Sequence, residues 1–433
     1  MGNIVAIVGR PNVGKSTLYN RLVGTREAIV DDQSGVTRDR KYGTCEWNGK
    51  KFIVVDTGGF VENSDDVFEA AIRSQVRLAV EEAAVLLFMV DTMTGITDLD
   101  EEVADLLRRT RKPVFLVVNK VDNNERLLEA NEFWSMGFEN VHFISSMSGS
   151  GTGDLLDAVA EEVEEYVPLE TDLPKIAIVG QPNVGKSSLV NALLGEERNI
   201  VTDVAGTTRD PIHTHYNKYE KEFIIVDTAG IRKKAKVHEN LEFYSVMRAI
   251  QAIEECDVAL IMIDAQMGIE SQDLAILRLA KERYKGIVIL VNKWDLVEKD
   301  TNTAREYEAE IKRRLAPFTD VPVVFISALE KQRIFKAIET AIDVAEARKQ
   351  KIKTSALNTW LEEATSRFTP PSHRGNLIKI KYVTQLPPAY PAFALFCNYP
   401  KHIPENYRRY LENQLREKFN FKGVPIALFF REK

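Results

Sequence analysis

Short runs of consecutive apolar residues, rich in valine and isoleucine, recur along the first 350 residues and alternate with stretches of helical periodicity. The runs are Ile4–Val8, Phe52–Asp56, Val85–Asp91, Val114–Asn119, Ile176–Val179, Phe223–Asp227, Val258–Asp264 and Ile287–Asn292. Strands that are apolar on both faces are typical of parallel sheets covered by helices on both sides. The pattern therefore predicts an α/β fold with a mostly parallel sheet and helices on both faces.

The same series of features occurs twice. Gly9 and Gly180 occupy matching positions 171 residues apart, and Asn119 and Asn292 match at a separation of 173. Such repetition indicates two copies of one domain, each of about 165 residues. We place the first copy at residues 1–167 and the second at residues 175–350, joined by a proline-bounded linker at residues 168–174.

Residues 351–433 follow a different pattern. Helical periodicity covers 356–368 and 405–419, and strand-like segments cover 377–384, 393–399 and 425–430. This α-β-β-α-β order predicts a small α+β domain. It holds 14 Lys/Arg against 6 Asp/Glu, while the whole chain has a net charge of −7. With 13 of the 37 aromatic residues also here, the segment favours a nucleic-acid partner, although a small domain also needs aromatics for its core.

Composition narrows the protein class. A chain of 433 residues with 44% hydrophobic and 28% charged residues is typical of a globular protein of two to four domains. No apolar run approaches a membrane span and no signal peptide precedes the first strand, so we expect a cytoplasmic protein. The cysteines Cys45, Cys256 and Cys397 are far apart, which predicts reduced thiols and no structural zinc.

Each copy carries a G-x-x-x-x-G-K-S motif directly after its first apolar run. The motif residues are Gly9, Arg10, Pro11, Asn12, Val13, Gly14, Lys15 and Ser16, and then Gly180, Gln181, Pro182, Asn183, Val184, Gly185, Lys186 and Ser187. Glycines let backbone N–H groups point at phosphate oxygens, the lysine adds a positive charge, and the serine hydroxyl can ligate Mg²⁺. Because a chance match would not come twice at matching positions, the motifs predict two phosphate-binding loops.

A second motif predicts that the base is guanine. Asn119-Lys120-Val121-Asp122 and Asn292-Lys293-Trp294-Asp295 each follow an apolar run. An aspartate carboxylate can accept two hydrogen bonds from guanine N1–H and its exocyclic amine, and adenine offers no such donor pair. Ser145 and Ser327 begin segments where we expect a backbone N–H to contact guanine O6.

Further motifs predict Mg²⁺ and a γ-phosphate sensor. They are Asp56-Thr57-Gly58-Gly59 and Asp227-Thr228-Ala229-Gly230. We expect Mg²⁺ near Ser16, Thr37 and Asp56 in the first copy and near Ser187, Thr208 and Asp227 in the second. A lone D-x-x-G is as often a simple turn at a strand end, so its weight here comes from its order among the other motifs.

The residue after each D-x-x-G motif is apolar. Phe60 and Ile231 stand where many GTPases have a glutamine that orients the attacking water. We therefore expect slow hydrolysis, in which positioning and charge neutralisation by Lys15, Lys186, Thr37 and Thr208 carry the catalysis.

With these motifs in order, the chain resembles the EngA (Der) family of bacterial tandem GTPases over nearly its full length. The segments K379IKYVTQ385 and Y407RRYLENQLRE417 are similar to that family's KH-like domain. The resemblance implies a role in assembly of the large (50S) ribosomal subunit, with GTP/GDP and rRNA as partners and no DNA. It also implies that Asn12 and Asn183 help hold a K⁺ ion, although an asparagine there can simply form a turn. The usual G-x-x-G loop of RNA-binding KH domains is absent.

Two alternatives stay open. The basic segment 232–236, which follows the second D-x-x-G motif, is either an RNA contact or a solvated loop. The chain as a whole is alternatively a nucleotide-gated scaffold, in which one copy holds nucleotide without hydrolysing it and the partner is a protein or a membrane component.

Overall fold

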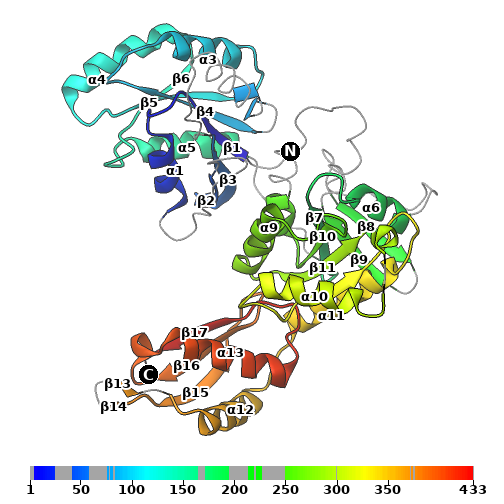
Figure 1. The fold of residues 1–433 in the computed structure, drawn as a ribbon. Helices are drawn as coiled ribbons and strands as arrows, with labels where there is room; N and C mark the ends of the chain where they lie inside the picture. The colour runs from blue at the N-terminus through cyan, green and yellow to red at the C-terminus, as the bar shows by residue number, and fades with distance from the viewer. Residues whose placement is uncertain are drawn as a thin grey trace. The chain divides into compact units, whose positions relative to one another are not determined.

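A computed structural model of the chain describes residues 4–24, 41–57, 76–77, 79–80, 83–163, 171–194, 213–218, 221–226, 249–298, 300–370, 372–373 and 376–432. The chain divides into two compact units, Met1–Leu169 and Glu170–Lys433 (Figure 1). The division falls within the predicted linker, but the predicted domain boundaries as a set stay a prediction. Among the described helices, none has the length and apolar character needed to cross a membrane.

The first unit contains a six-stranded sheet in the order β2-β3-β1-β4-β5-β6. Its strands are β1 Ile4–Val8, β2 Lys41–Trp47, β3 Lys50–Asp56, β4 Val85–Asp91, β5 Val114–Asn119 and β6 Asn140–Phe143. All neighbours are parallel except β2 and β3, which form an antiparallel hairpin. The hairpin turns at Asn48 and Gly49, both with positive φ (48° and 78°), as a two-residue turn requires. The predicted mostly parallel sheet is confirmed.

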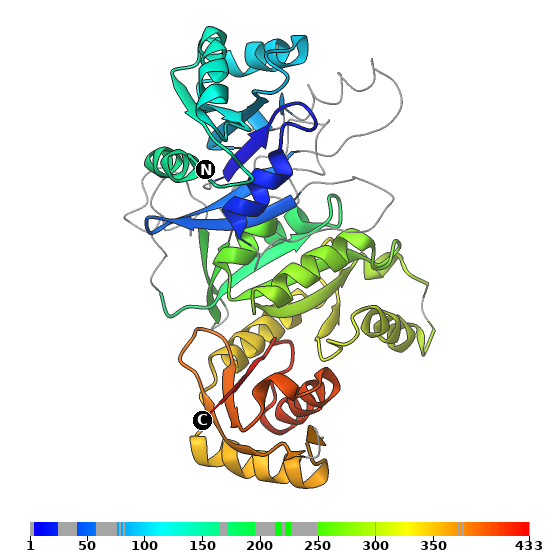
Figure 2. The same ribbon diagram turned by 90° about the vertical axis from the view of Figure 1, so that its left-hand side faces the viewer.

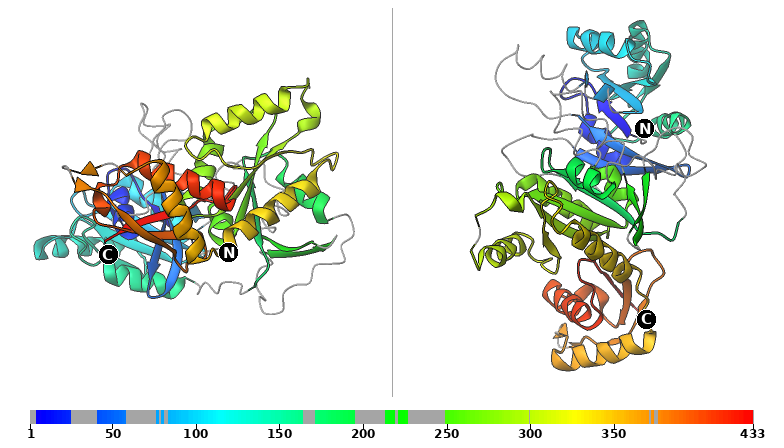
Figure 3. Two further views of the ribbon diagram at one scale, coloured as in Figure 1. Left: turned by 90° about the horizontal axis from the view of Figure 1, so that it is seen from below. Right: turned by 90° about the vertical axis from the view of Figure 1, so that its right-hand side faces the viewer.

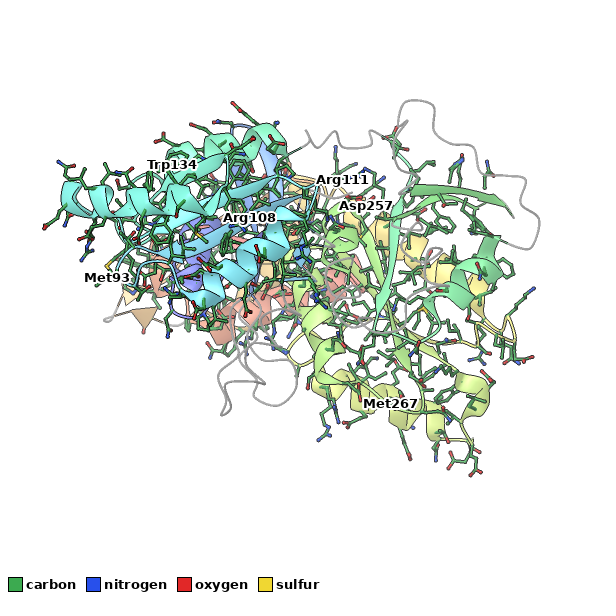
Figure 4. All side chains as sticks on the ribbon, turned by 90° about the horizontal axis from the view of Figure 1, so that it is seen from above. Met93, Arg108, Arg111, Trp134, Asp257 and Met267 are labelled. Atoms are coloured by element: carbon green, nitrogen blue, oxygen red, sulfur yellow. The ribbon has the colours of Figure 1, made fainter. Side chains whose placement is uncertain are left out.

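Helices cover both faces of this sheet. They are α1 Lys15–Val23, α3 Asp98–Arg108, α4 Asn124–Ala130, the 3₁₀ helix η1 Asn131–Met136, and α5 Thr152–Glu162. The apolar residues of α1 and α5 join one cluster with β1, β3 and β4. Arg108 of α3 donates to Met136 O (2.8 Å) at the end of η1, which carries Trp134 (Figure 4). This bond ties α3 to η1.

The second unit begins with a sheet of the same topology, in the order β12-β11-β10-β7-β9-β8. Its strands are β7 Lys175–Gly180, β8 His213–Lys218, β9 Lys221–Val226, β10 Val258–Asp264, β11 Gly286–Asn292 and β12 Val323–Phe325. The associated helices are α6 Lys186–Leu194, α9 Ser271–Glu282, η3 Trp294–Leu296, α10 Thr303–Arg314 and α11 Ile334–Lys349 (Figure 3). Arg348 of α11 is buried and pairs with Asp257 (2.8 Å), which precedes β10 (Figure 4).

The C-terminal part of the second unit has the predicted α-β-β-α-β order. Its elements are α12 Thr354–Arg367, β13 Ser372–His373, β14 Asn376–Leu377, β15 Ile380–Gln385, β16 Ala392–Cys397, η4 Pro400–His402, α13 Glu405–Phe419 and β17 Ala427–Arg431 (Figure 2). β15 pairs antiparallel with β16, and β16 pairs parallel with β17. The short β13–β14 pair was not predicted, because two residues per strand leave no periodic pattern to read.

Backbone hydrogen bonds join this C-terminal part to the preceding sheet. Gly423 N donates to Asp320 O (2.7 Å), and Ile287 N at the start of β11 donates to Gly423 O (2.7 Å). The φ of Gly423 is +73°, and a Cβ there would lie 2.7 Å from Ile287 O, so glycine is required. Tyr284 and Tyr390 stack across the same junction with ring centroids 4.3 Å apart. The two parts also share one apolar cluster, so they form a single core.

Candidate functional site

The two predicted phosphate-binding loops each connect the first strand of a sheet to the following helix. Gly9 and Gly14 have φ of 145° and 103°, and Gly180 and Gly185 have φ of 146° and 101°. A Cβ on the first glycine of either loop would collide with the carbonyl of Met89 or Met262 on the neighbouring strand. The glycines are therefore needed both for backbone conformation and for close packing of the loop on the sheet.

Asn12 and Asn183 occupy the left-handed turn in the middle of each loop. Their φ angles are 65° and 63°, a conformation that asparagine tolerates better than most residues, and both are exposed. This geometry accounts for asparagine as a turn former and also leaves the side chain free to face a ligand. The predicted K⁺ role of these residues stays a prediction.

The lysine of each loop hydrogen-bonds to backbone carbonyls of the same loop. Lys15 Nζ donates to Gly9 O (2.8 Å) and Arg10 O (2.7 Å), and Lys186 Nζ donates to Gly180 O (2.7 Å) and to Gln181 O. Burial lowers the pKa of Lys15 to about 8, and the nearby Asp56 carboxylate partly opposes this shift. A buried ammonium that has lost water is a strong partner for a phosphate group.

Two of the predicted Mg²⁺ ligands of the first unit lie side by side. Ser16 Oγ donates to Asp56 Oδ2 at 2.6 Å, and Asp56 is fully buried at the end of β3. A hydroxyl and a carboxylate are the hard oxygen ligands that Mg²⁺ prefers, so the residues present fit this ion. In the second unit Ser187 holds the equivalent place in α6, while Asp227 lies outside the described residues.

The asparagine of each guanine motif links two loops. Asn119 Nδ2 donates to Val13 O (2.7 Å) and its Oδ1 accepts from Ser146 N (2.9 Å). Asn292 repeats this arrangement with Val184 O (2.7 Å) and Ala328 N (2.9 Å). Both asparagines are 3% exposed. The side chain thus fastens the phosphate-binding loop to the segment that we predict lies beside the base.

The other guanine-motif residues also lie at the strand ends. Lys120 and Lys293 have positive φ (68° and 61°) and pair with Asp91 (2.5 Å) and Asp264 (2.6 Å). Arg126 Nη1 donates to both carboxylate oxygens of Asp122, at 2.8 Å each. This guanidinium holds the carboxylate in one orientation at the expected base position.

The predicted serines mainly close their own loops. Ser145 N donates to Ser150 O (2.9 Å), and Ser327 N donates to Gln332 O (3.2 Å). Ser145 Oγ accepts from Ser148 N (3.3 Å), and Ser327 Oγ accepts from Glu330 N (3.1 Å). The contact of these segments with guanine O6 stays a prediction.

Comparison with known proteins agrees with this geometry. Residues 4–120 and 175–293 match a family model described as "50S ribosome-binding GTPase". Residues 351–431 match a second, described as "KH-domain-like of EngA bacterial GTPase enzymes, C-terminal". The chain is 60% identical over 436 residues to GTPase Der of Christiangramia forsetii, and the alignment covers 100% of each protein. The chain belongs to the GTPase Der family.

A second relative of high identity gives the same family. GTPase Der of Flavobacterium johnsoniae is 56% identical over 434 residues, covering 100% of this chain and 99% of the relative. Among solved structures, Era of Aquifex aeolicus bound to GDP·AlF4⁻ is 30% identical, covers 45% of this chain and 68% of its own, and has a TM-score of 0.33. As a member of the Der family, the chain is a GTP hydrolase with two G domains in tandem and a C-terminal KH-like domain.

The motifs alone did not predict one contact that both G domains of this Der-family GTPase share. Arg10 Nε donates to Asp100 Oδ2 (3.1 Å) in the first, and Gln181 Nε2 donates to Asp273 Oδ2 (3.1 Å) in the second. Asp100 and Asp273 are buried at the third position of α3 and α9, where each completes a capping box. A threonine or glutamate three residues before an aspartate, as in Thr97-x-x-Asp100, is the signal that could have revealed it.

The two aspartates have different partners. Asp100 faces the charged Arg10, whereas Asp273 faces the neutral amide of Gln181. Burial raises the pKa of Asp273 to about 6, although hydrogen bonds from Glu270 N and Gln181 lower it in part. Asp273 Oδ1 is buried with no hydrogen-bond partner among the residues that the structure describes, so it is the natural place for a proton.

The second guanine motif lies beside a cluster of aromatic side chains. Trp294 packs on Phe325 and Tyr307, with ring centroids 4.3 and 5.6 Å away. Val121 holds the same place in the first motif. Val121 N donates to Ile144 O, directly after β6, and Trp294 N donates to Ile326 O, directly after β12. The backbone of the guanine motif is therefore common to both sites, while the side chain beside it differs.

Several predicted residues lie outside the described parts of the chain. They are Thr37, Thr208, Gly58, Gly59, Phe60, Asp227, Thr228, Ala229, Gly230, Ile231 and the basic segment 232–236. Thr57, which is described, is buried and donates through Oγ1 to Ile7 O (2.7 Å). It therefore fixes the end of β3 to β1.

Proposed function

We propose that this GTPase acts as a switch in assembly of the large (50S) ribosomal subunit. It binds rRNA-containing particles in one nucleotide state and leaves them after hydrolysis. The matched family description and the excess of basic residues in 351–433 support a ribosomal partner. With ribosomal particles as its partner, the protein works in the cytoplasm.

One strand carries the proposal. β11 begins at the contact with the KH-like domain, where Ile287 N donates to Gly423 O, and it ends at Asn292 of the guanine motif. All seven residues of β11 are buried, so the strand cannot bend or shift independently of the sheet. Nucleotide binding at one end and RNA binding at the other therefore act on the same rigid element.

Sedimentation with purified large subunits tests the proposal. The full chain is mixed with the particles and a non-hydrolysable GTP analogue, with GDP, or with no nucleotide, and the pelleted fraction is measured. We expect strong pelleting in only one nucleotide state. Equal pelleting in all three conditions would refute the switch, and absence of pelleting in every condition would refute the ribosomal partner.

The scaffold alternative makes a different prediction about turnover. If both G domains hydrolyse GTP, Lys15→Ala and Lys186→Ala each lower the rate, because each removes the cation that faces the phosphates. If one G domain only holds nucleotide, one of the two substitutions leaves kcat unchanged. Paired single variants in the full chain thus separate the two hypotheses.

We also propose the ions that serve the reaction. Mg²⁺ would be held by Ser16, Thr37 and Asp56, and by Ser187, Thr208 and Asp227. When bound, it supplies positive charge to the phosphate oxygens. K⁺ would be held beside Asn12 and Asn183, where no glutamine orients the water.

The K⁺ proposal predicts faster turnover when K⁺ replaces Na⁺ at constant ionic strength. Asn12→Ala and Asn183→Ala together should remove that difference while guanine binding remains. Equal rates of the unsubstituted chain in the two salts would end this part of the proposal.

A further inference from the structure

The two faces of the KH-like sheet have different coverings. Val383, Phe393 and Leu395 belong to the apolar core that α12 and α13 also supply, and all three are fully buried. Leu428 and Phe430 of β17 pack against the same core. The helices therefore lie over the face of the sheet from which these side chains project, since alternate residues of a strand point to opposite faces.

The register places a row of large side chains on the opposite face. Tyr382 of β15 pairs with Phe396 of β16, which pairs with Arg431 of β17. In the next row on the same face, Thr384 pairs with Ala394, which pairs with Phe429. We call Tyr382, Phe396, Phe429 and Arg431 the aromatic face.

The aromatic face is accessible and ordered. Phe429 is 40% exposed, Arg431 is exposed, and Tyr382 and Phe396 are half-buried. The rings of Tyr382 and Phe396 stack with centroids 4.4 Å apart and planes 13° from parallel. Ala394, which lies between Thr384 and Phe429 in the neighbouring row, is fully buried, so the larger side chains around it form the outer surface. None of the four residues is part of the apolar core as far as the structure describes it.

We propose that the aromatic face binds unstacked bases of single-stranded RNA. Aromatic rings on an open sheet stack on bases of any sequence, and an arginine guanidinium plane can do the same. The proposal rests on the proposed function, because it names the surface through which the chain meets RNA. It also supplies a contact in a KH-like domain whose sequence has no G-x-x-G loop.

Charge favours RNA over an apolar protein partner. Lys379 directly precedes β15 and Lys381 is its second residue, next to Tyr382 in sequence, and both are exposed. Arg431 ends the row on the other edge strand. A β-bulge between Ile380 and Tyr382 shifts the register at Lys381. Cations on both edges of an aromatic surface match a base flanked by two phosphates. A duplex does not fit, because its bases are already stacked on each other.

The proposal is tested by fluorescence anisotropy. A short labelled single-stranded RNA of mixed sequence is titrated with the full-length chain. Phe429→Ala should raise Kd by about 5- to 150-fold, the range expected when one base loses its stacking partner. Arg431→Ala should raise Kd and also make Kd less dependent on salt concentration. Thermal melting of each variant confirms that the KH-like domain remains folded.

Matched controls lie on the helical side of the same domain. Phe368 is 55% exposed where it packs on Tyr407 and Tyr410, and Arg409 is an exposed arginine of α13 paired with Glu405. Phe368→Ala and Arg409→Ala remove the same kinds of side chain and should leave Kd unchanged. A strand of the same length without bases should bind the Phe429→Ala variant and the unsubstituted chain equally.

The proposal is overturned if Phe429→Ala binds the single-stranded RNA as tightly as the unsubstituted chain. It is also overturned if Phe368→Ala weakens binding as much as Phe429→Ala does, or if the Phe429→Ala loss persists on the strand without bases. Sedimentation of the unsubstituted chain with large subunits separates this outcome from failure of the proposed function. A chain that pellets normally but has an inert aromatic face refutes only the proposal made here.

Discussion

Replacing Asn292 by alanine should uncouple the two loops of the second guanine site. The side chain donates to Val184 O (2.7 Å) and accepts from Ala328 N (2.9 Å), so alanine removes both bonds at once. Val184 and Ala328 are 5% and 3% exposed. Water cannot readily replace the lost partners at such burial, and both backbone groups would be left without hydrogen bonds.

The expected loss of binding free energy follows from that burial. A buried polar group left without its partner costs about 1–3 kcal/mol, so two such groups cost at least about 2 kcal/mol. A nucleotide binds only when both loops are in place. The bound state therefore carries the full free-energy cost of the two lost hydrogen bonds, and this cost reduces the binding free energy. Since about 1.4 kcal/mol corresponds to a tenfold change, we expect GDP to bind at least about 30-fold more weakly.

Titration with a fluorescent GDP analogue measures this loss. The chain should carry Lys15→Ala throughout, so that the second site dominates the signal. Asn302→Ala serves as the control, because Asn302 is exposed and its side chain makes no capping bond. A Kd for Asn292→Ala within the error of the Asn302→Ala value would show that other contacts hold the loops and would refute a coupling role for Asn292.

Two further predictions concern stability. Asp273 has a pKa of about 6 in the folded chain against the ordinary value of 3.8 for an aspartate side chain, so the folded state takes up its proton first as pH falls. Its contribution to the free energy of unfolding should therefore rise by roughly 1 kcal/mol from pH 7 to pH 5. Urea unfolding should show that Asp273→Asn removes this increment, and the same pH dependence in both proteins would contradict the assignment. Gly423→Ala should destabilise the second unit by about 1–3 kcal/mol, because its Cβ would lie 2.7 Å from Ile287 O and 2.8 Å from Pro322 Cδ. Calorimetry should show a lower melting temperature for that unit, and an unchanged one would mean that the junction can relax.

The buried elements of both sheets could be predicted from sequence, because their apolar runs are unambiguous. β1, β4, β5 and β10 have the predicted bounds, and α13 begins and ends where its periodicity does. The edge strands β2 and β8 were missed because only alternate residues are buried, as in Thr214 and Tyr216 of β8, and the remaining polar positions hide the strand. The Asn48-Gly49 turn could have revealed the first of them.

The site was predictable as a set of motifs but not as a network. Spacing identified Asn119 and Asn292, yet it could not show that each side chain faces inward to bind two loops. Contacts between residues about 90 positions apart, such as Arg10 with Asp100, depend on how the helices pack. Sequence periodicity carries no information on that packing. The docking of Gly423 on β11 was hidden for the same reason.

We infer that one chain carries two complete guanine-nucleotide sites of the same construction. Equilibrium dialysis with labelled GDP, in the presence of Mg²⁺ and excess ATP, measures this directly. We expect two GDP molecules per chain, and one per chain for either Asp122→Ala or Asp295→Ala. One GDP per chain before any substitution, or displacement of GDP by ATP, would contradict it.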